Sequence, residues 1–215
     1  MLIDLIAGAR PNFMKIAPII DAIKAAQAAG HNIQFRLVHT GQHYDKKMSG
    51  DFFQQLGIPT PHVNLEVGSG TQAEQTAKIM MGYEALLLES PSNLCLVVGD
   101  VTSTMACAIA AKKLNIDVAH VEAGIRSGDR SMPEGINRMV TDSITDYFFT
   151  TSEVANTNLK NAGVAYCRLV QKMKICWVMI YLFILRMLKL ILSFSGWFSR
   201  LSSFQDRSRV LRTPY

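Results

Sequence analysis

Ionisable side chains crowd residues 120–138. The segment that leads into this stretch is apolar and rich in β-branched residues, which predicts a buried strand, and Glu122, Arg126, Glu134 and Arg138 follow it. Open parallel α/β sheets bind ligands beyond the carboxyl ends of their strands. Carboxylates placed there can transfer protons, and arginines can hold a phosphorylated substrate. Composition alone leaves a second interpretation equally open, a solvated loop whose charges pair with one another.

Two further predicted strand ends carry groups of the same kinds. Arg10 and Lys15 flank the expected start of the first helix, where unpaired N–H groups favour anions, although an Arg and a Lys near a helix start are more often surface charges. This segment is neither a Walker loop nor the three-glycine dinucleotide fingerprint. Asp100 follows the predicted strand 94–98 and can act as a base beside the N–H groups of a helix start. It or Thr102 can instead simply cap that helix.

The loop after the second predicted strand contains Gln42 and His43. A loop histidine can contact a ligand or act as a general acid, although it is more often an exposed surface group. The residue types alone therefore assign His43 no role.

The elements that must position these groups alternate regularly along the chain. From residue 1 to about residue 164, short apolar runs alternate with helical patterns, which predicts an α/β domain with a parallel sheet. We expect strands at residues 2–7, 33–39, 63–65, 94–98, 116–121 and 147–150. We expect helices from residue 16 to the stop at Gly30 and at residues 51–56, 71–89, 103–113, 134–146 and 152–163.

The formal net charge of +5 is concentrated in the C-terminal tail. Residues 1–165 contain 13 Lys and Arg against 16 Asp and Glu, whereas residues 166–215 contain 9 against 1. The predicted domain is therefore slightly acidic, and we expect no nucleic-acid partner.

The cysteines and the N-terminus both predict a cytoplasmic protein. The four cysteines have neither a Cys-x-x-Cys pair nor a histidine at metal-ligand spacing, so we expect reduced thiols and no metal site. The chain opens directly into a predicted strand, without the features of a signal peptide. Secretion is therefore not expected.

Four motifs, in this order, resemble those of the non-hydrolysing UDP-N-acetylglucosamine 2-epimerases. They are Gly-Ala-Arg-Pro at residues 8–11 with Lys15 and Pro18, Thr-Gly-Gln-His at 40–43, Gly-Asp-Val-Thr-Ser-Thr at 99–104, and His-Val-Glu-Ala-Gly-Ile-Arg-Ser at 120–127 through Pro-Glu to Asn-Arg at 137–138. The resemblance covers residues 1–164. It implies a Rossmann-like parallel sheet with helices on both faces, as the N-terminal half of a two-domain GT-B architecture whose cleft holds the substrate.

The resemblance also implies a reaction that needs no external cofactor. The enzyme removes the proton at C2 of the sugar and expels UDP from C1, and then re-adds UDP after reprotonation on the opposite face. Proton transfer on two faces requires carboxyl groups, and a departing diphosphate requires fixed cations. The implied catalytic carboxylates are Asp100, Glu122 and Glu134, and the implied substrate contacts are Arg10, Lys15 and Arg138, with Gln42 and His43 in a loop linked to a second, regulatory UDP-N-acetylglucosamine. The family tends to form dimers, so a homodimer is expected.

The tail, residues 165–215, does not continue the resemblance. It is apolar and irregular from residue 173 to 198 and basic beyond residue 200. A membrane span at residues 175–198 is one interpretation, but Arg186 and Lys189 oppose it at roughly 2.5–3.5 kcal/mol each. We favour a frameshift, because the charge and the pattern change together.

These features predict an epimerase whose activity is impaired in this 215-residue form. Three alternatives remain, namely an inactive nucleotide-sugar-binding remnant, a membrane-anchored binding module and, third, a glycosyltransferase of the same architecture. The carboxylate set argues against a glycosyltransferase, which has no need of proton exchange at C2.

Overall fold

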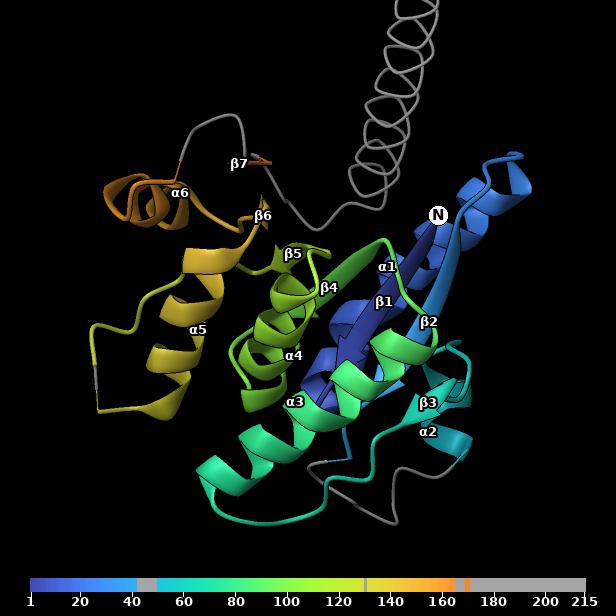
Figure 1. Ribbon diagram of the computed structural model, residues 1–215. Coiled ribbons are helices and arrows are strands. Elements are labelled where there is room, and N and C mark those ends of the chain that lie inside the picture. The colour runs from blue at the N-terminus through green and yellow to red at the C-terminus, as the bar shows by residue number, and fades with distance from the viewer. Residues whose placement is uncertain (42–49, 130, 165–168, 171–215) are drawn as a thin grey trace, which may run out of the picture.

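A computed structural model of the chain describes residues 1–41, 50–129, 131–164 and 169–170, with only the backbone described at 50–52 and 169–170. Within these residues, seven parallel strands form one sheet in the order β3-β2-β1-β4-β5-β6-β7 (Figure 1). The strands are β1 (Leu2–Ala7), β2 (Gln34–His39), β3 (Val63–Asn64), β4 (Leu94–Val98), β5 (Asp117–Val121), β6 (Tyr147–Phe149) and β7 (Leu169–Val170). The helices are α1 (Arg10–Ala28), α2 (Gly50–Gln55), α3 (Gln72–Glu89), α4 (Thr102–Lys113), α5 (Pro133–Ile144) and α6 (Glu153–Asn161).

The strand order reverses at β1. The chain first moves from β1 outward to β2 and β3, and then returns to place β4 on the other side of β1. In a doubly wound sheet, the crevice at such a switch point, outside the carboxyl ends of the strands, is where ligands bind. The loops after β1 and β4 border this crevice, and the loop after β5 lies next to it.

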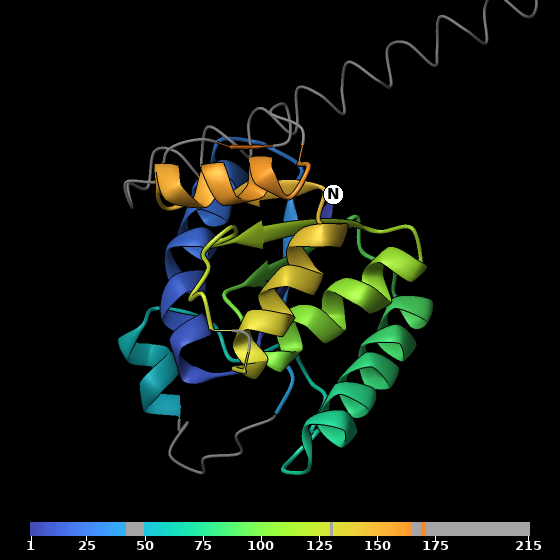
Figure 2. The ribbon, with the colours of Figure 1, turned by 90° about the vertical axis from the view of Figure 1, so that its left-hand side faces the viewer.

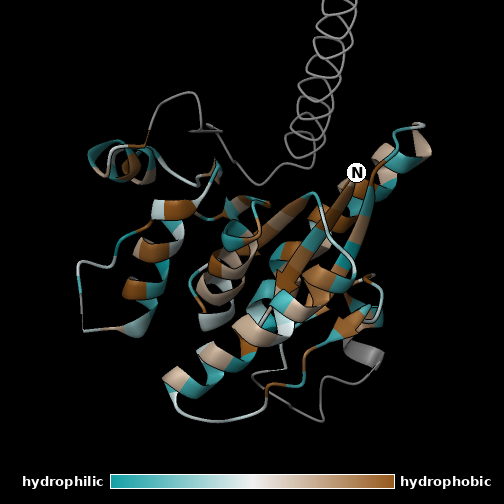
Figure 3. Ribbon diagram, in the orientation of Figure 1, coloured by the Kyte–Doolittle hydropathy of each residue, from teal (hydrophilic) through white to brown (hydrophobic). Residues whose placement is uncertain are grey.

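Helices cover both faces of the sheet, which confirms the predicted Rossmann-like α/β fold (Figure 2). Alternate residues of the central strands enter two separate apolar clusters, one with α1 and the other with α3 and α4. The five residues of β4 are all buried, as expected for a strand covered on both sides. Figure 3 shows the central strands as largely hydrophobic, whereas the helices carry both hydrophobic and hydrophilic residues.

One charged group lies inside this apolar core. Asp4 of β1 and Arg36 of β2 are directly opposite in the parallel register, and Arg36 donates to both carboxylate oxygens at 2.7 and 2.8 Å. Tyr83 of α3 adds a third hydrogen bond to Asp4, at 2.9 Å. We call these three residues the core cluster.

Two features differ from the prediction by more than one or two residues. Helix α1 begins at Arg10 and not after Lys15, because the side chain of Asn12 accepts hydrogen bonds from the N–H groups of Gly8 and Ala9, and Pro11 favours a first turn. Arg10 and Lys15 therefore both lie on the helix. The second difference is β7, a two-residue strand too short to give a sequence pattern, which lies beyond residue 164.

Cys95 and Cys107 are free, buried thiols, as predicted, whereas Cys167 and Cys176 lie outside the described residues. The described part of the chain contains no helix that is both long and apolar enough to cross a membrane. The apolar stretch at 173–198 lies outside that part, so both explanations of the tail stay predictions.

Candidate functional site

The loops after β1, β4 and β5 are tied together at the carboxyl edge of the sheet. The Asn12 amide, which organises the start of α1, also donates to the carbonyl of Val98 at the end of β4, at 3.0 Å. The N–H of Gly99 donates to the carbonyl of Val121 at the end of β5, also at 3.0 Å. These two hydrogen bonds, one from a side chain and one from the backbone, fix the relative positions of the three loops.

Gly99 and Glu122 both adopt left-handed backbone conformations at this edge, with φ of 73° and 70°. A Cβ atom at residue 99 would lie 3.5 Å from the carboxylate of Glu122 and 3.8 Å from the Lys15 ammonium, which are ordinary contact distances, so the positive φ and not lack of space favours glycine there. A left-handed non-glycine residue costs about 1–3 kcal/mol and persists where surrounding contacts hold it. Here the N–H groups of Glu122 and Ala123 both donate to the carbonyl of Phe149, at 2.9 and 3.1 Å.

Four charged side chains form a continuous series of contacts across the three loops. The Lys15 ammonium pairs with the carboxylate of Glu122, and Arg138 of α5 donates to the backbone carbonyl of Glu122. A second guanidinium nitrogen of Arg138 pairs with the Asp100 carboxylate at 2.6 Å. Asn137 fixes the same loop by donating to the carbonyl of Asp100 at 3.0 Å. We call Lys15, Asp100, Glu122 and Arg138 the edge cluster.

The edge cluster is anchored on the inside and open on the outside. The Arg138 side chain is only 8% exposed, whereas those of Lys15 and Asp100 are 41% and 39% exposed and that of Glu122 is 25% exposed. The buried guanidinium therefore holds two accessible carboxyl residues at a fixed spacing. Such an arrangement can transfer protons to and from a ligand bound at the edge.

A pocket of about 420 Å³ adjoins the edge cluster. Asp100, Glu134 and Arg138 line it together with the loop after β5. Glu134 is exposed and lies one turn before Arg138 on α5. Glu134 thus shares this pocket with Asp100 and Arg138, but Glu122 is not among its lining residues.

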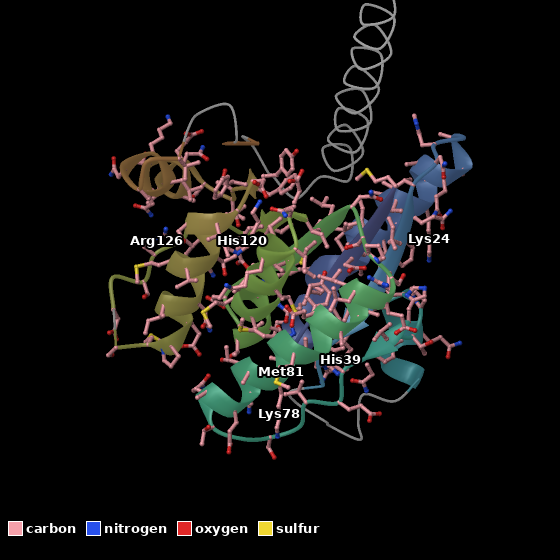
Figure 4. The ribbon with its side chains drawn as sticks, in the orientation of Figure 1. Lys24, His39, Lys78, Met81, His120 and Arg126 are labelled. Carbon is pink, nitrogen blue, oxygen red and sulfur yellow. The ribbon has the colours of Figure 1, made fainter. Side chains whose placement is uncertain are left out.

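A second charged group lies behind the edge cluster. His120 of β5 contacts the Gly99 carbonyl at 2.7 Å and the Asp142 carboxylate of α5 at 2.8 Å, and Arg126 pairs with Asp142 at 2.6 Å. Figure 4 shows His120 and Arg126 on the side of the sheet near α5 and α6. Burial alone would raise the pKa of Asp142, but hydrogen bonds and charge from His120 and Arg126 outweigh it and hold that pKa below its usual value.

Comparison with known proteins identifies the family. Residues 24–175 match the family model described as UDP-N-acetylglucosamine 2-epimerase. The chain belongs to this family. A UDP-N-acetylglucosamine 2-epimerase homolog of Methanococcus maripaludis is 48% identical over 164 residues, which are 76% of this chain and 44% of that protein. A UDP-2,3-diacetamido-2,3-dideoxy-D-glucuronate 2-epimerase of Pseudomonas aeruginosa is 45% identical over 163 residues, covering 76% of this chain and 45% of that protein.

A solved structure of the same family has the same fold. The crystal structure of the Methanocaldococcus jannaschii UDP-GlcNAc 2-epimerase in complex with UDP-GlcNAc and UDP matches this chain with a TM-score of 0.74 at 43% identity. The match covers 79% of this chain and 45% of that one. The chain therefore spans less than half the length of the epimerases that it matches.

Most of the site residues expected from the epimerase motifs lie close together. The edge cluster joins four of them by direct contacts, and Glu134 lines the adjoining pocket. Arg10 is exposed at the first residue of α1, just beyond the carboxyl end of β1. Gln42 and His43 lie outside the described residues. The roles of all eight residues stay predictions.

Sequence reasoning gave no role to several polar side chains that organise the loops around the edge cluster. Asn12, Asn137, His120 and Asp142 are all buried. His120 and Asn137 belong to the motifs, but a positioning role cannot be predicted from their residue types alone. The available signal was a polar side chain on an otherwise apolar strand or helix face.

Proposed function

We propose that the chain carries the N-terminal, proton-transferring part of an epimerase that interconverts UDP-N-acetylglucosamine and UDP-N-acetylmannosamine. One observation supports this most directly: Arg138 holds Asp100 through its carboxylate and Glu122 through its backbone carbonyl, at the carboxyl edge of the sheet. Membership of the epimerase family and the likeness to a structure with bound UDP-GlcNAc support the choice of substrate.

The reaction divides between the carboxylates and the cations. One carboxylate removes the C2 proton, the C2–H electron pair forms the C1=C2 bond, and the C1–O bond breaks with its electrons passing to UDP. In the return step UDP oxygen attacks C1 and a second carboxyl group delivers a proton to the other face of C2. Asp100, Glu122 and Glu134 are the candidates for these transfers.

Lys15 and Arg10 are the candidate partners of the diphosphate. Both lie on the first two turns of α1, where the helix N-terminus also favours negative charge. Arg138 has five N–H donors and uses two nitrogens on Asp100 and Glu122, so it can also contact a ligand in the adjoining pocket. We further propose that Gln42 and His43 bind a regulatory nucleotide sugar and that the assembled enzyme is a homodimer in the cytoplasm.

A second substrate is supported by one relative. The Pseudomonas aeruginosa protein named for UDP-2,3-diacetamido-2,3-dideoxy-D-glucuronate is about as similar to this chain as the UDP-N-acetylglucosamine enzymes. Both substrates undergo the same inversion at C2, so the edge cluster can serve either. The two are compared in the same assay.

The test is hydrogen exchange at C2. The 215-residue chain is incubated with each nucleotide sugar in D2O, with the full-length Methanocaldococcus jannaschii epimerase as positive control, and deuterium at C2 is followed by NMR. We expect incorporation into one sugar, more slowly than in the control, because the chain covers less than half of such enzymes. If the control exchanges and this chain neither exchanges C2 nor binds the nucleotide sugar, the proposal is wrong. Binding without exchange would instead indicate the inactive remnant.

A further inference from the structure

His120 is fully buried, yet both of its ring nitrogens have polar partners. Nε2 lies 2.7 Å from the carbonyl oxygen of Gly99, and Nδ1 lies 2.8 Å from Oδ1 of Asp142. A backbone carbonyl can only accept a hydrogen bond, so Nε2 must carry a proton. The state of Nδ1 therefore depends on Asp142.

Asp142 is surrounded by donors. Its Oδ2 atom accepts hydrogen bonds from the N–H of Gly124 at 3.2 Å and from the Arg126 guanidinium at 2.6 Å. Both contacts favour the carboxylate form. An ionised Asp142 can only accept, and Nδ1 of His120 must then also carry a proton.

We propose that His120 is held as a doubly protonated imidazolium and acts as a positioning residue for Asp100 and Glu122. The hydrogen bonds stand independently, whereas the positioning role rests on the proposed function of the two carboxylates. Gly99, one partner of the ring, directly precedes Asp100, and His120 lies on β5 two residues before Glu122, which directly follows the strand. The His120 ring therefore connects the two backbone segments that carry the Asp100 and Glu122 side chains.

The second partner connects the ring to α5. Asp142 lies one turn after Arg138 on this helix, so α5 contacts the sheet edge twice on successive turns. The outer contact is Arg138 with Asp100 and Glu122, and the inner contact is Asp142 with His120. Loss of the inner contact is expected to release the outer one, because both depend on the same distance between α5 and the strands.

The first measurement is the protonation of the ring itself, by NMR of the ligand-free chain with ¹⁵N-labelled histidine at neutral pH. We expect both nitrogens of His120 to carry protons that exchange slowly with water. His62 is the internal control, because its Nδ1 accepts the N–H of Leu37 at 2.9 Å and must be unprotonated. A single protonated nitrogen on His120 would overturn the proposal.

The variant Asp142→Asn tests the origin of the second proton. The amide oxygen can still accept from Gly124 and Arg126, while its N–H₂ can donate to Nδ1 of His120. We expect the ring to become neutral, with one proton on Nε2, and both ring contacts to persist. A ring that stays doubly protonated in this variant would contradict the assignment of Asp142 as its counter-ion.

The second measurement reports positioning, through the exchange of the Arg138 guanidinium protons with water. We expect His120→Phe to accelerate this exchange by about tenfold or more, as for loss of a charged hydrogen bond, and Asp142→Asn to leave it nearly unchanged. Asp4→Asn, in the distant core cluster, is the control for general destabilisation and should not accelerate it. If His120→Phe does not fold, Asp142→Ala takes its place with the same expected result.

Unchanged Arg138 exchange in a folded His120→Phe or Asp142→Ala variant would show that His120 is structural only. The same conclusion follows if Asp4→Asn accelerates the exchange equally. Neither measurement uses a nucleotide sugar. Failure of the proposed function, which appears as absent C2 exchange in D2O, therefore cannot be confused with failure of this inference.

Discussion

The core cluster and the edge cluster are built from the same kinds of residues, but their surroundings differ. In the core cluster, Asp4 is fully buried, Arg36 is 11% exposed at its side chain, and Tyr83 closes the group from α3. In the edge cluster, Arg138 is buried in the same way, but Lys15 and Asp100 are each about four-tenths exposed. One cluster is sealed by a helix and the other faces solvent at the switch point of the sheet.

This difference in solvent exposure indicates which of the two clusters can exchange protons with a ligand. The two oxygens of Asp4 accept three side-chain hydrogen bonds, so its capacity for a further partner is small. Glu122 and Asp100 each accept one side-chain donor within the described residues, from Lys15 and Arg138 respectively. Their remaining lone pairs are available to a ligand. The core cluster therefore serves the fold, and the edge cluster is the one that can transfer protons.

The largest expected effect is a loss of C2 exchange when a carboxylate of the edge cluster is replaced. Glu122→Gln and Asp100→Asn should each slow C2 deuteration by about 10²–10⁴-fold, because an amide cannot exchange the proton, with little change in thermal stability. Glu84→Gln, an exposed carboxyl on α3, is the matched control and should leave the rate unchanged. Equal rates for Glu122→Gln and the control would remove Glu122 from the mechanism.

Replacing a residue of the core cluster is expected to lower the stability of the fold and not the activity. Asp4→Ala leaves the Arg36 guanidinium buried without its counter-ion and should lower the free energy of unfolding by about 3–5 kcal/mol. Urea denaturation measures this change. The double variant Asp4→Leu with Arg36→Met should recover most of the loss, because an apolar pair has no charge to desolvate. A change in C2 exchange per folded molecule of Asp4→Ala would break the division between the clusters.

The position of the edge cluster could largely be predicted from the sequence. The strands β1, β4 and β5 are apolar runs buried on both faces, and the rule that strand ends meet at one edge placed Asp100 near Glu122 and Arg138. The core cluster was not predicted, because only the parallel register places Asp4 opposite Arg36.

Local conformation was the least predictable part of the site. The left-handed backbone of Glu122 is not favoured by its residue type and depends on contacts from β6. Asp142 has the residue type of a solvated helix face, and its burial depends on how α5 packs against β5. Such tertiary contacts override local preference and leave no periodic signal in the chain.

A smaller effect is expected at Lys15, the most exposed member of the edge cluster. Lys15→Met should change the free energy of unfolding by less than about 1 kcal/mol, since exposed ion pairs contribute little. The affinity of the Lys15→Met variant for UDP, measured by calorimetry, should be about tenfold or more lower than that of the parent chain, because a charged contact is lost. Lys24→Met, at the opposite end of α1 (Figure 4), is the control and should bind UDP normally. Equal affinities would show that the diphosphate lies elsewhere.

Acidification should lower the stability of the fold by protonating Asp142, the partner of His120 and Arg126. The pKa of Asp142 is lowered in the folded chain, so its contribution to stability is fully present above the ordinary aspartate pKa of about 3.9 and is lost as pH falls through the lower folded value. Asp142→Asn cannot lose this contribution on acidification. The melting temperature of the parent chain should therefore exceed that of Asp142→Asn at neutral pH, and the difference should shrink below about pH 4. A difference that stays constant across this range would mean that Asp142 stabilises the fold through its shape and hydrogen bonds, and not through its charge.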